Sequence, residues 1–595
     1  MPDPFILLDD ARPEGASPAR LYQSPREVVI ARRVDEVLPA LERIAALQAE
    51  GAQLAGYFAY EAGLALEERL APLAAARSGG AGPLVWFGAF DGYREIPAAQ
   101  VPAWLAETGE AGRAQIGPID PQLSAGGYAK AFAELQERIA AGDIYQANLT
   151  FPLAGSYRGD PLALYGAARP AAGAGYGGVL FDGTHWLLSF SPELFFAERD
   201  GAALVKPMKG TRPRGRDAAE DARLKDELAA SIKDRAENLM IVDLLRNDLS
   251  RVAEAGSVKV DHPFAVESYP TVHQMVTTVR ARLQPGKGAV DMLRALFPCG
   301  SITGAPKIRA MELIDAVERD ARGPYCGAIG RIDAGGEAAF NVAIRTLRLT
   351  PGENRRGQAV LGVGSAIVAD SEVMTEWREC LVKGGFVRMS AGGADLIETM
   401  RFTPEGGIPL LELHLERIKA SAAELGFVFD RHAVRNAIQA LCFEADAPAR
   451  LRLLVSRGGA YSLELGALPA PIDEPLACAV LRLPVDSGDW RLRHKSSDRG
   501  FYDDGLTAAR DAGASEALFL RDDGLLTEGC FTNLFVEREG KLLTPPARLG
   551  LLPGVLRRSL LDDGHAVEAE LTLDDLKDGF LVGNALRGLM KAKLL

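Results

Sequence analysis

Apolar and polar positions along the chain predict a mixture of helices and strands. Residues 127–144 carry apolar side chains at helical spacing, and residues 225–253 predict a long helical stretch. Residues 186–198 predict a strand, a turn and a second strand, while residues 338–349 and 358–368 predict buried strands. This pattern is typical of an α+β fold.

The pattern is interrupted at residues 389–394, MSAGGA, which are small and turn-prone and follow a helical segment. A new pattern then begins with LIETMRF. Residues 411–426 predict a helix, residues 451–457 a strand, and short strands follow towards the end. We therefore expect a linker at 388–394 and a separate domain at 395–595.

Composition narrows the classes of protein. The chain has 595 residues, too many for one hydrophobic core. Its net charge of −13 argues against nucleic-acid binding. The six cysteines are scattered without a CxxC pair, which is typical of reduced thiols in the cytoplasm. The first residues lack a basic region and soon turn acidic, so no signal peptide is expected, and no apolar run of about 18 residues predicts a membrane span.

Two pairs of acidic residues are candidate metal ligands. Asp234 and Glu237 are three residues apart on a predicted helix, and Glu376 and Glu379 repeat that spacing, so each pair shares a helix face. Four carboxylates could hold Mg²⁺, which prefers oxygen ligands. Spacing alone favours the alternative of two solvated acidic faces.

Seven motifs that occur in order along the chain favour the metal site over the solvated faces. They are SPELFF, KPMKGTRPRG, KDRAENLMIVDLLRNDL, FPCGSITGAPKIRAME, GPYCGAIG, NVAIRTL and DSEVMTEWRECLVK. Together they resemble the chorismate-utilising enzymes over roughly residues 120–387. The resemblance implies a sheet sandwich flanked by helices, with an N-terminal subdomain at 1–120 and a chorismate-binding catalytic domain at 121–387.

The resemblance also implies roles for individual residues. Glu237 and Glu379 are expected as the principal Mg²⁺ ligands, supported by Asp234 and Glu376, and the metal would hold the ring carboxylate of chorismate. Glu193 is expected as the general acid that protonates the departing 4-hydroxyl. The expected substrate-binding residues are His273, Thr303, Tyr325, Arg345, Gly362, Gly364 and Lys383, with Tyr325 and Arg345 on the enolpyruvyl carboxylate.

Two positions discriminate between members of this family. Lys209 stands where anthranilate synthases carry a small residue, and a desolvated lysine can be a neutral nucleophile that attacks the substrate ring. The alternative role for Lys209 is electrostatic anchoring of the substrate. Gln146 stands where isochorismate and salicylate synthases carry a lysine base, so ammonia is expected as the nucleophile instead of water. The alternative for Gln146 is a packed polar residue.

The expected ammonia needs a source. A glutamine amidotransferase requires a nucleophilic cysteine in a tight turn, and none of the six cysteines lies in a G-x-C-x-G sequence. Cys299, in FPCGS, is expected to be structural. The chain is therefore expected to use free ammonia or a separate glutamine amidotransferase subunit.

The last 200 residues contain a second set of motifs: LIETMRF, HLERIKASAAELGF, HKSSDRGFYD, LTEGCFTNLF, LLPGVLRR and VGNALRGLM. They resemble the fold-type IV enzymes that use pyridoxal 5′-phosphate (PLP), and this implies an α/β domain of two subdomains. Lys495 would attach PLP covalently and move protons, and Glu528 would pair with the pyridine nitrogen. Arg417 and the backbone of Val555 would bind the phosphate. The alternative for Glu528 and Arg417 is an ordinary surface charge pair.

The two resemblances imply one reaction sequence. Chorismate and ammonia would give 4-amino-4-deoxychorismate, and PLP-dependent loss of pyruvate would then give 4-aminobenzoate, a folate precursor. The fold-type IV domain would allow a homodimer. The first rival is an anthranilate synthase component joined to an aminotransferase, and Lys209 argues against it. The second rival is a fusion in which one half is inactive and regulatory.

Overall fold

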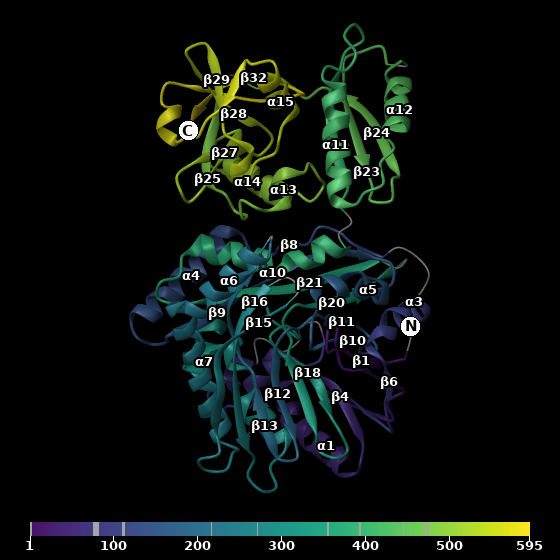
Figure 1. The fold of residues 1–595 in the computed structure, drawn as a ribbon, viewed down its shortest axis with the longest axis vertical. Helices are drawn as coiled ribbons and strands as arrows, with labels where there is room; N and C mark the ends of the chain where they lie inside the picture. The colour runs from purple at the N-terminus through teal and green to yellow at the C-terminus, as the bar shows by residue number, and fades with distance from the viewer. Residues whose placement is uncertain are drawn as a thin grey trace. The chain divides into compact units, whose positions relative to one another are not determined.

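The computed structural model describes residues 3–595 except 75–81, 110–113, 216, 270–271, 354–355, 392–393, 444, 471 and 473–474. The chain divides into two compact units, Met1–Gly392 and Gly393–Leu595. The linker expected at 388–394 includes residues 392–393, which lie outside the described residues. Each unit is described by itself (Figure 1).

The first unit contains two antiparallel sheets. One runs in the order β17 (Gly304–Ala305), β9 (Gln146–Arg158), β21 (Arg356–Ile367), β20 (Thr346–Pro351), β11 (Trp186–Ser189), β10 (Gly177–Phe181), β1 (Phe5–Asp9), β2 (Ala19–Gln23) and β6 (Arg94–Ile96), and β7 (Gln115–Ile116) and β8 (Asp120–Pro121) pair with β9. Its longest pairing joins β9 to β21, from Arg158 opposite Arg356 to Ala147 opposite Ile367.

The other sheet of this unit runs in the order β14 (Met208–Pro213), β16 (Val272–Arg282), β13 (Ala202–Val205), β12 (Leu194–Arg199), β19 (Ala338–Val342), β18 (Ala328–Ile332), β4 (Gln53–Phe58), β5 (Val85–Phe90) and β3 (Glu27–Ala31), and β15 (Lys259–Ser268) pairs with β16. The first 120 residues therefore supply strands to both sheets and are integral to the unit.

The two sheets pack face to face between layers of helices. Ile6 and Leu180 of one sheet and Tyr57, Trp86 and Ile329 of the other form the apolar layer between them. The helices packed on the first sheet are α3 (Val101–Thr108), α4 (Ala125–Ala140), α5 (Pro161–Ala172), α9 (Lys307–Val317) and α10 (Val373–Ala391), and those on the second are α1 (Val37–Ala49), α7 (Ile232–Ser250) and α8 (Ala289–Leu296). The predicted sheet sandwich flanked by helices is confirmed.

The helical stretch predicted at 225–253 is two helices, α6 (Ala218–Ala230) and α7. Ser231 separates them because its backbone is extended, with ψ of 114°. Its hydroxyl accepts a 3.2 Å hydrogen bond from the backbone N–H of Asp234 and so caps α7. The serine therefore separates α6 from α7 and begins the helix that carries Asp234 and Glu237.

The second unit also has two sheets. The smaller, antiparallel one runs β22 (Leu396–Phe402), β23 (Ala449–Val455), β24 (Tyr461–Ala467), and α11 (Leu411–Leu425) and α12 (Arg431–Phe443) share its core. The larger, mixed one runs β27 (Leu526–Gly529), β26 (Glu516–Leu520), β25 (Leu476–Arg482), β32 (Gly588–Leu594), β31 (Phe580–Asn584), β28 (Asn533–Arg538), β29 (Lys541–Thr544) and β30 (Ala566–Glu568). The two-subdomain α/β fold predicted here is confirmed.

Short helices complete the second unit: α13 (Trp490–Arg493), α14 (Gly500–Asp511) and α15 (Val555–Asp562). The segment between α13 and α14 pairs with β22, because the backbone N–H of Ile397 donates a 2.9 Å hydrogen bond to the carbonyl of Lys495. Among the described residues, none of the helices has the length and apolar character needed to span a bilayer.

Candidate active sites

Glu193 is a buried carboxyl group in the turn between β11 and β12. The Ser191 hydroxyl donates a 2.6 Å hydrogen bond to the carbonyl of Val342 and fixes this turn. Glu193 is 4% exposed, and its Oε1 accepts a 2.8 Å hydrogen bond from the hydroxyl of Ser301. Burial raises the pKa of Glu193 to about 7, although Ser301 and the charge of Lys209 lower it. The group can therefore hold a proton at neutral pH.

Lys209 lies on β14 and faces charges of both signs. Burial lowers the pKa of its ammonium group; the carboxylates of Glu237, Glu193 and Glu379 oppose that shift, and the ammonium of Lys383 adds to it. A lowered pKa increases the fraction of neutral amine, which is the nucleophilic form. The structure thus brings the predicted nucleophile and the predicted general acid into one electrostatic environment.

The predicted metal ligands lie on α7 and α10. Glu379 pairs with Lys383 at 2.6 Å, Glu376 accepts a 2.7 Å hydrogen bond from Ser371, and Asp234 pairs with Arg212 at 2.9 Å. Burial raises the pKa of Glu237, and the neighbouring charges of Asp234 and Glu376 add to this.

These carboxylates were tested for a fit to Mg²⁺. Within the described part of the chain, no group of three or more histidine, cysteine, aspartate or glutamate side chains is close enough to hold a metal ion. Hard carboxylate oxygens are nevertheless what Mg²⁺ prefers, and this ion commonly takes one or two protein carboxylates with substrate oxygens and water. Glu237 and Glu379 have the carboxylate chemistry for that smaller requirement, although Glu379 is paired with Lys383, as Asp234 is with Arg212.

Gln146 has polar groups that no protein group satisfies in the described structure, and Arg345 has a guanidinium group in buried surroundings. Burial lowers the pKa of Arg345, with no counter-charge opposing it, and its backbone φ of 49° is left-handed. Gln146, on β9, is 0% exposed, and neither Oε1 nor Nε2 has a hydrogen-bond partner among the described residues. Buried polar atoms without partners are costly, so Gln146 is a candidate for contact with a ligand.

Among the other predicted substrate-binding residues, Tyr325 and Gly362 line a cavity, whereas Lys383 and Thr303 donate to backbone carbonyls. The ring of Tyr325 lies against Gly362, where an added Cβ atom would be 2.2 Å from the ring, and both line a cavity of about 80 Å³. Lys383 donates a 2.9 Å hydrogen bond to the carbonyl of Gly364. The hydroxyl of Thr303 donates to the carbonyl of Cys299 at 3.1 Å. Thr303 is thus bonded to its own loop.

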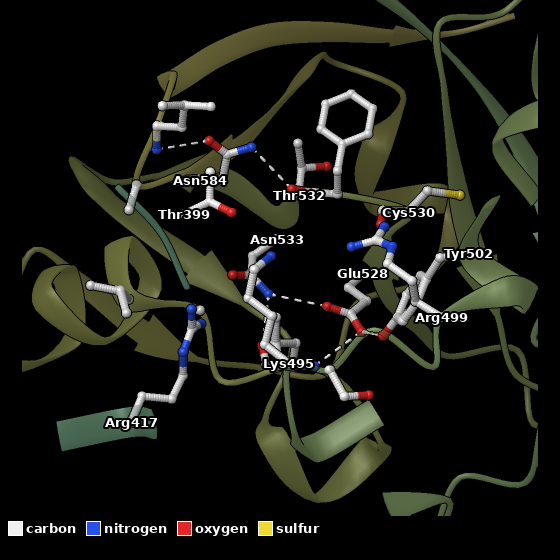
Figure 2. A pocket seen from close by; sticks show the side chains of 18 of the residues that line it. Thr399, Arg417, Lys495, Arg499, Tyr502, Glu528, Cys530, Thr532, Asn533 and Asn584 are labelled. Atoms are coloured by element: carbon white, nitrogen blue, oxygen red, sulfur yellow. Dashed lines mark hydrogen bonds between the residues drawn. The ribbon is translucent and has the colours of Figure 1, made fainter. Parts of the chain in front are cut away.

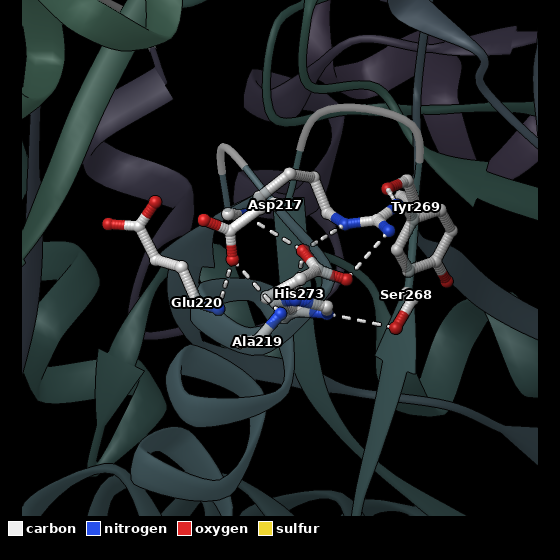
Figure 3. Close-up of polar contacts among 9 residues, drawn as sticks. Asp217, Ala219, Glu220, Ser268, Tyr269 and His273 are labelled. Atoms are coloured by element: carbon white, nitrogen blue, oxygen red, sulfur yellow. Dashed lines mark hydrogen bonds and ion pairs between the residues drawn. The ribbon is translucent and has the colours of Figure 1, made fainter.

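His273, on β16, belongs to a network of polar side chains (Figure 3). Its Nδ1 lies 2.8 Å from the Ser268 hydroxyl, and its Nε2 lies 3.0 Å from a carboxylate oxygen of Asp221. Arg214 donates two hydrogen bonds of 2.8 Å to the same carboxylate. Both ring nitrogens of His273 are engaged by protein, so the ring has no free nitrogen for a substrate.

In the second unit, Lys495 lies on the wall of a cavity of about 310 Å³ (Figure 2). Burial lowers the pKa of its ammonium group to about 8, and the charges of Arg417 and Arg499 contribute to this shift. A group with this pKa can exist as a neutral amine near neutral pH and can accept a proton.

Glu528, on β27, also lines this cavity and is held by three donors. Tyr502 donates a 2.5 Å hydrogen bond to Oε1, the backbone N–H of Leu552 donates to the same oxygen at 3.0 Å, and Asn533 lies 3.5 Å from Oε2 (Figure 2). Burial raises the pKa of Glu528 to about 8. A nearby cation would stabilise the ionised form, so the site suits a protonated ring nitrogen.

Arg417 is oriented by a buried carboxylate that sequence reasoning missed. Glu398, 1% exposed, accepts hydrogen bonds from Arg417 Nε at 2.9 Å and Nη2 at 2.6 Å and from His414 Nδ1 at 2.6 Å. The remaining Nη1 lies 3.3 Å from the carbonyl of Pro553. The signal was present in LIETMRF, where a single acid interrupts an apolar strand.

The cavity was tested for a fit to PLP. Gly554 and Val555, which begin α15, line it, and a Cβ atom at Gly554 would be 1.9 Å from Asn533 Oδ1. Glycine therefore permits the helix N-terminus to approach the cavity, where its N–H groups can bind phosphate. With Lys495, Glu528 and Arg417 on the same walls, the donors match an amine-reactive aldehyde, a ring nitrogen and a phosphate. The residues fit the cofactor.

The folds and sites define the family. Residues 3–388 match the chorismate binding enzyme family, and residues 395–595 match amino-transferase class IV, a class that implies PLP. The chain belongs to the chorismate binding enzyme family, as its motifs predicted. The structure of an anthranilate synthase component I from Streptococcus pneumoniae shows the same fold, with a TM-score of 0.53 and 24% sequence identity. The match covers 63% of this chain and 93% of that chain.

Curated relatives are similar over the first unit. The aminodeoxychorismate synthase component 1 of Klebsiella aerogenes is 44% identical over 256 residues, which are 43% of this chain and 56% of that protein. The aminodeoxychorismate synthase of Streptomyces griseus is 46% identical over 268 residues, 45% of this chain and 36% of that protein. The chain thus spans about half or less of the relatives it matches.

Proposed function

We propose that the chain catalyses two consecutive reactions: amination of chorismate by ammonia to 4-amino-4-deoxychorismate, and loss of pyruvate from that product to give 4-aminobenzoate. The observation that carries the proposal is the pair formed by Lys209 and Glu193, an amine with a lowered pKa and a carboxyl group with a raised one. Groups shifted in opposite senses divide the roles of nucleophile and acid.

In the first unit, neutral Lys209 attacks C2 of the substrate ring while Glu193 gives its proton to the departing 4-hydroxyl, which leaves as water. Ammonia then adds at C4, the bond from Lys209 to C2 breaks, and the lysine leaves as an amine. Arg345 binds a substrate carboxylate because no counter-charge among the described residues opposes the effect of burial on its guanidinium. Mg²⁺, held by Glu237 and Glu379, would neutralise the other carboxylate.

In the second unit, PLP supplies an electron sink for the carbon that bears the amine. Lys495 removes the proton from C4 of the ring, after which the C3–O bond breaks and the enolpyruvyl group leaves as pyruvate. Glu528 would keep the ring nitrogen of the cofactor protonated, and Arg417 and the start of α15 would hold its phosphate. Aromatisation of the product ring drives the step.

Ammonia reaches the first unit from solution or from a separate glutamine amidotransferase subunit. The cysteines support this, because Cys299, Cys326, Cys380, Cys478 and Cys530 are buried and Cys442 is partly buried. A buried thiol is a poor candidate for the nucleophile of a glutaminase.

Product analysis tests the proposal. The wild-type chain, supplied with chorismate, ammonium, Mg²⁺ and PLP, is expected to release 4-aminobenzoate and pyruvate, and Lys209→Ala is expected to lose the amination. The control variant is Lys225→Ala, because Lys225 is exposed. Arg212 is avoided because it pairs with Asp234, a predicted metal ligand. Release of 2-aminobenzoate by the wild-type chain would overturn the proposal.

A further inference from the structure

The small sheet of the second unit has one apolar face and one basic face. On β23, Leu451, Leu453 and Val455 point into the core beneath α11 and α12. Because side chains alternate along a strand, Arg450 and Arg452 point to the opposite face. Thr399 of β22 is directly opposite Arg452 in the register and lies on the same face.

This basic face borders a second cavity, of about 330 Å³. Its lining residues are Ile397, Thr399, Arg450, Arg452, Lys495, Arg499 and Asp503. Thr399, Arg450, Lys495 and Arg499 also line the cavity fitted to PLP. Lys495 therefore lies, with Arg450 and Arg499, where the two cavities adjoin, while Arg452 lines the second cavity only.

The two arginines on β23 are poorly satisfied by protein. In the described part of the chain, the buried Nε atoms of Arg450 and Arg452 have no hydrogen-bond partner. Glu464 approaches Nη2 of Arg450 only to 3.9 Å, and its side chain is 62% exposed. Such an exposed, distant contact contributes little. Two guanidinium groups thus face the cavity with donors available to a ligand.

The third arginine is partly engaged. Arg499 donates a 2.9 Å hydrogen bond to the carbonyl of Cys530 and a 3.2 Å hydrogen bond to Asp503, whose side chain is 65% exposed. Arg499 therefore adds positive charge to the cavity in a fixed position. Asp503 is the acid in the cavity lining, against three arginines and Lys495.

We propose that Arg450 and Arg452 form a subsite for the carboxylates of a dianionic substrate, which places the amine of that substrate next to Lys495. The inference rests on the proposed function and deepens it, because 4-amino-4-deoxychorismate carries two carboxylates. Guanidinium groups bind carboxylates through paired N–H donors. Arg450 and Arg452 are separated by one residue on the strand, so the two groups together suit a dicarboxylate better than a monocarboxylate. A monocarboxylate amine leaves one arginine without a ligand.

The test supplies 4-amino-4-deoxychorismate directly and measures release of 4-aminobenzoate by the PLP-loaded full chain. Arg452→Gln and Arg450→Gln are each expected to raise KM about 10- to 100-fold with a smaller effect on kcat, since each removes charged hydrogen bonds to the ligand. Arg452→Lys is expected to lie between Arg452→Gln and wild type. The matched control is Arg401→Gln, on the same sheet face, exposed and outside the lining of the cavity.

A binding measurement without turnover accompanies it. The visible absorbance of the bound cofactor is titrated with 3-(carboxymethoxy)benzoate, a dicarboxylate without an amine, and with benzoate. Arg452→Gln is expected to weaken the dicarboxylate about tenfold or more and to leave benzoate little changed. An unchanged KM and an unchanged dicarboxylate affinity in both glutamine variants would overturn the subsite, as would equal losses in Arg401→Gln.

The two proposals fail in different ways. If the wild-type chain makes no 4-aminobenzoate from supplied 4-amino-4-deoxychorismate, the proposed function fails, while the dicarboxylate titration still reports on the subsite. If the wild-type chain makes 4-aminobenzoate and the arginine variants match it in KM and in dicarboxylate affinity, the function stands and the subsite is wrong.

Discussion

The hydroxyl of Ser301 donates a 2.8 Å hydrogen bond to the carboxyl group of Glu193, from 108 residues further along the chain. Ser301 lies in the short 3₁₀ turn Gly300–Ile302, and Glu193 lies between β11 and β12. The bond stabilises the ionised form of Glu193, while burial favours the neutral form by more. Proton donation by Glu193 therefore depends on how these two opposing effects balance.

Glu193→Gln is expected to slow chorismate amination about 10²- to 10⁴-fold, because the amide cannot supply a proton. In the wild-type chain, activity should fall as pH rises through about 7, where Glu193 loses its proton. Ser301→Ala removes a hydrogen bond that lowers this pKa, so it should move the fall to higher pH. Chorismate consumption against pH measures both effects, and an unshifted profile in Ser301→Ala would contradict this role for Glu193.

Gln146→Met is expected to increase the free energy of unfolding by about 1–2 kcal/mol, because it removes a buried amide without a protein partner. The same change should abolish amination if the amide serves the ligand. Gln136→Met is the control, since Gln136 donates a 2.8 Å hydrogen bond to the carbonyl of Val368 and its loss should destabilise. Denaturant unfolding measures the change in stability of both variants. A Gln146→Met chain that is destabilised and fully active would show that Gln146 is a packing residue.

Arg322→Met is expected to destabilise the first unit by about 3–5 kcal/mol, because it removes the cation that faces the buried carboxylate of Glu318. Arg322 also donates hydrogen bonds to the carbonyls of Ile302 and Asn148 and so joins the loop after α8 to β9. Arg319→Met, at an exposed pair with Asp320, should cost less than about 1 kcal/mol. Equal losses of stability would argue against this ranking.

Glu528→Gln is expected to slow release of 4-aminobenzoate from supplied 4-amino-4-deoxychorismate about 100-fold, because the amide cannot stabilise a protonated ring nitrogen by charge. PLP should still bind, as judged by its visible absorbance. Tyr502→Phe keeps the carboxyl group and removes the 2.5 Å hydrogen bond, so its effect should be smaller. If Glu528→Gln retains the wild-type rate, the assignment of Glu528 to the ring nitrogen is wrong.

The sequence predicted those features that arise from local periodicity. The apolar segments on either side of a turn in residues 186–198 indicated β11 and β12, and helical spacing in residues 127–144 indicated α4. The break at Ser231 was missed because a serine within a helical pattern is tolerated or caps a new helix according to the backbone around it.

The sequence did not predict which residues, distant along the chain, would contact the site residues. Motifs identified Arg417 but not Glu398, which pairs with it from β22, and they identified His273 but not Asp221, which engages its ring. Arg450 and Arg452 read as ordinary basic positions in a strand until the fold set them beside Lys495. Such pairings depend on tertiary packing, which no local pattern encodes.

If the product of one site is consumed at the other, Lys495→Ala should separate the two reactions. The variant and the wild-type chain are each supplied with chorismate, ammonium, Mg²⁺ and PLP, and products are separated over time. The wild-type chain is expected to release 4-aminobenzoate, and the variant is expected to accumulate 4-amino-4-deoxychorismate. Formation of 4-aminobenzoate by Lys495→Ala at the wild-type rate would contradict this expectation.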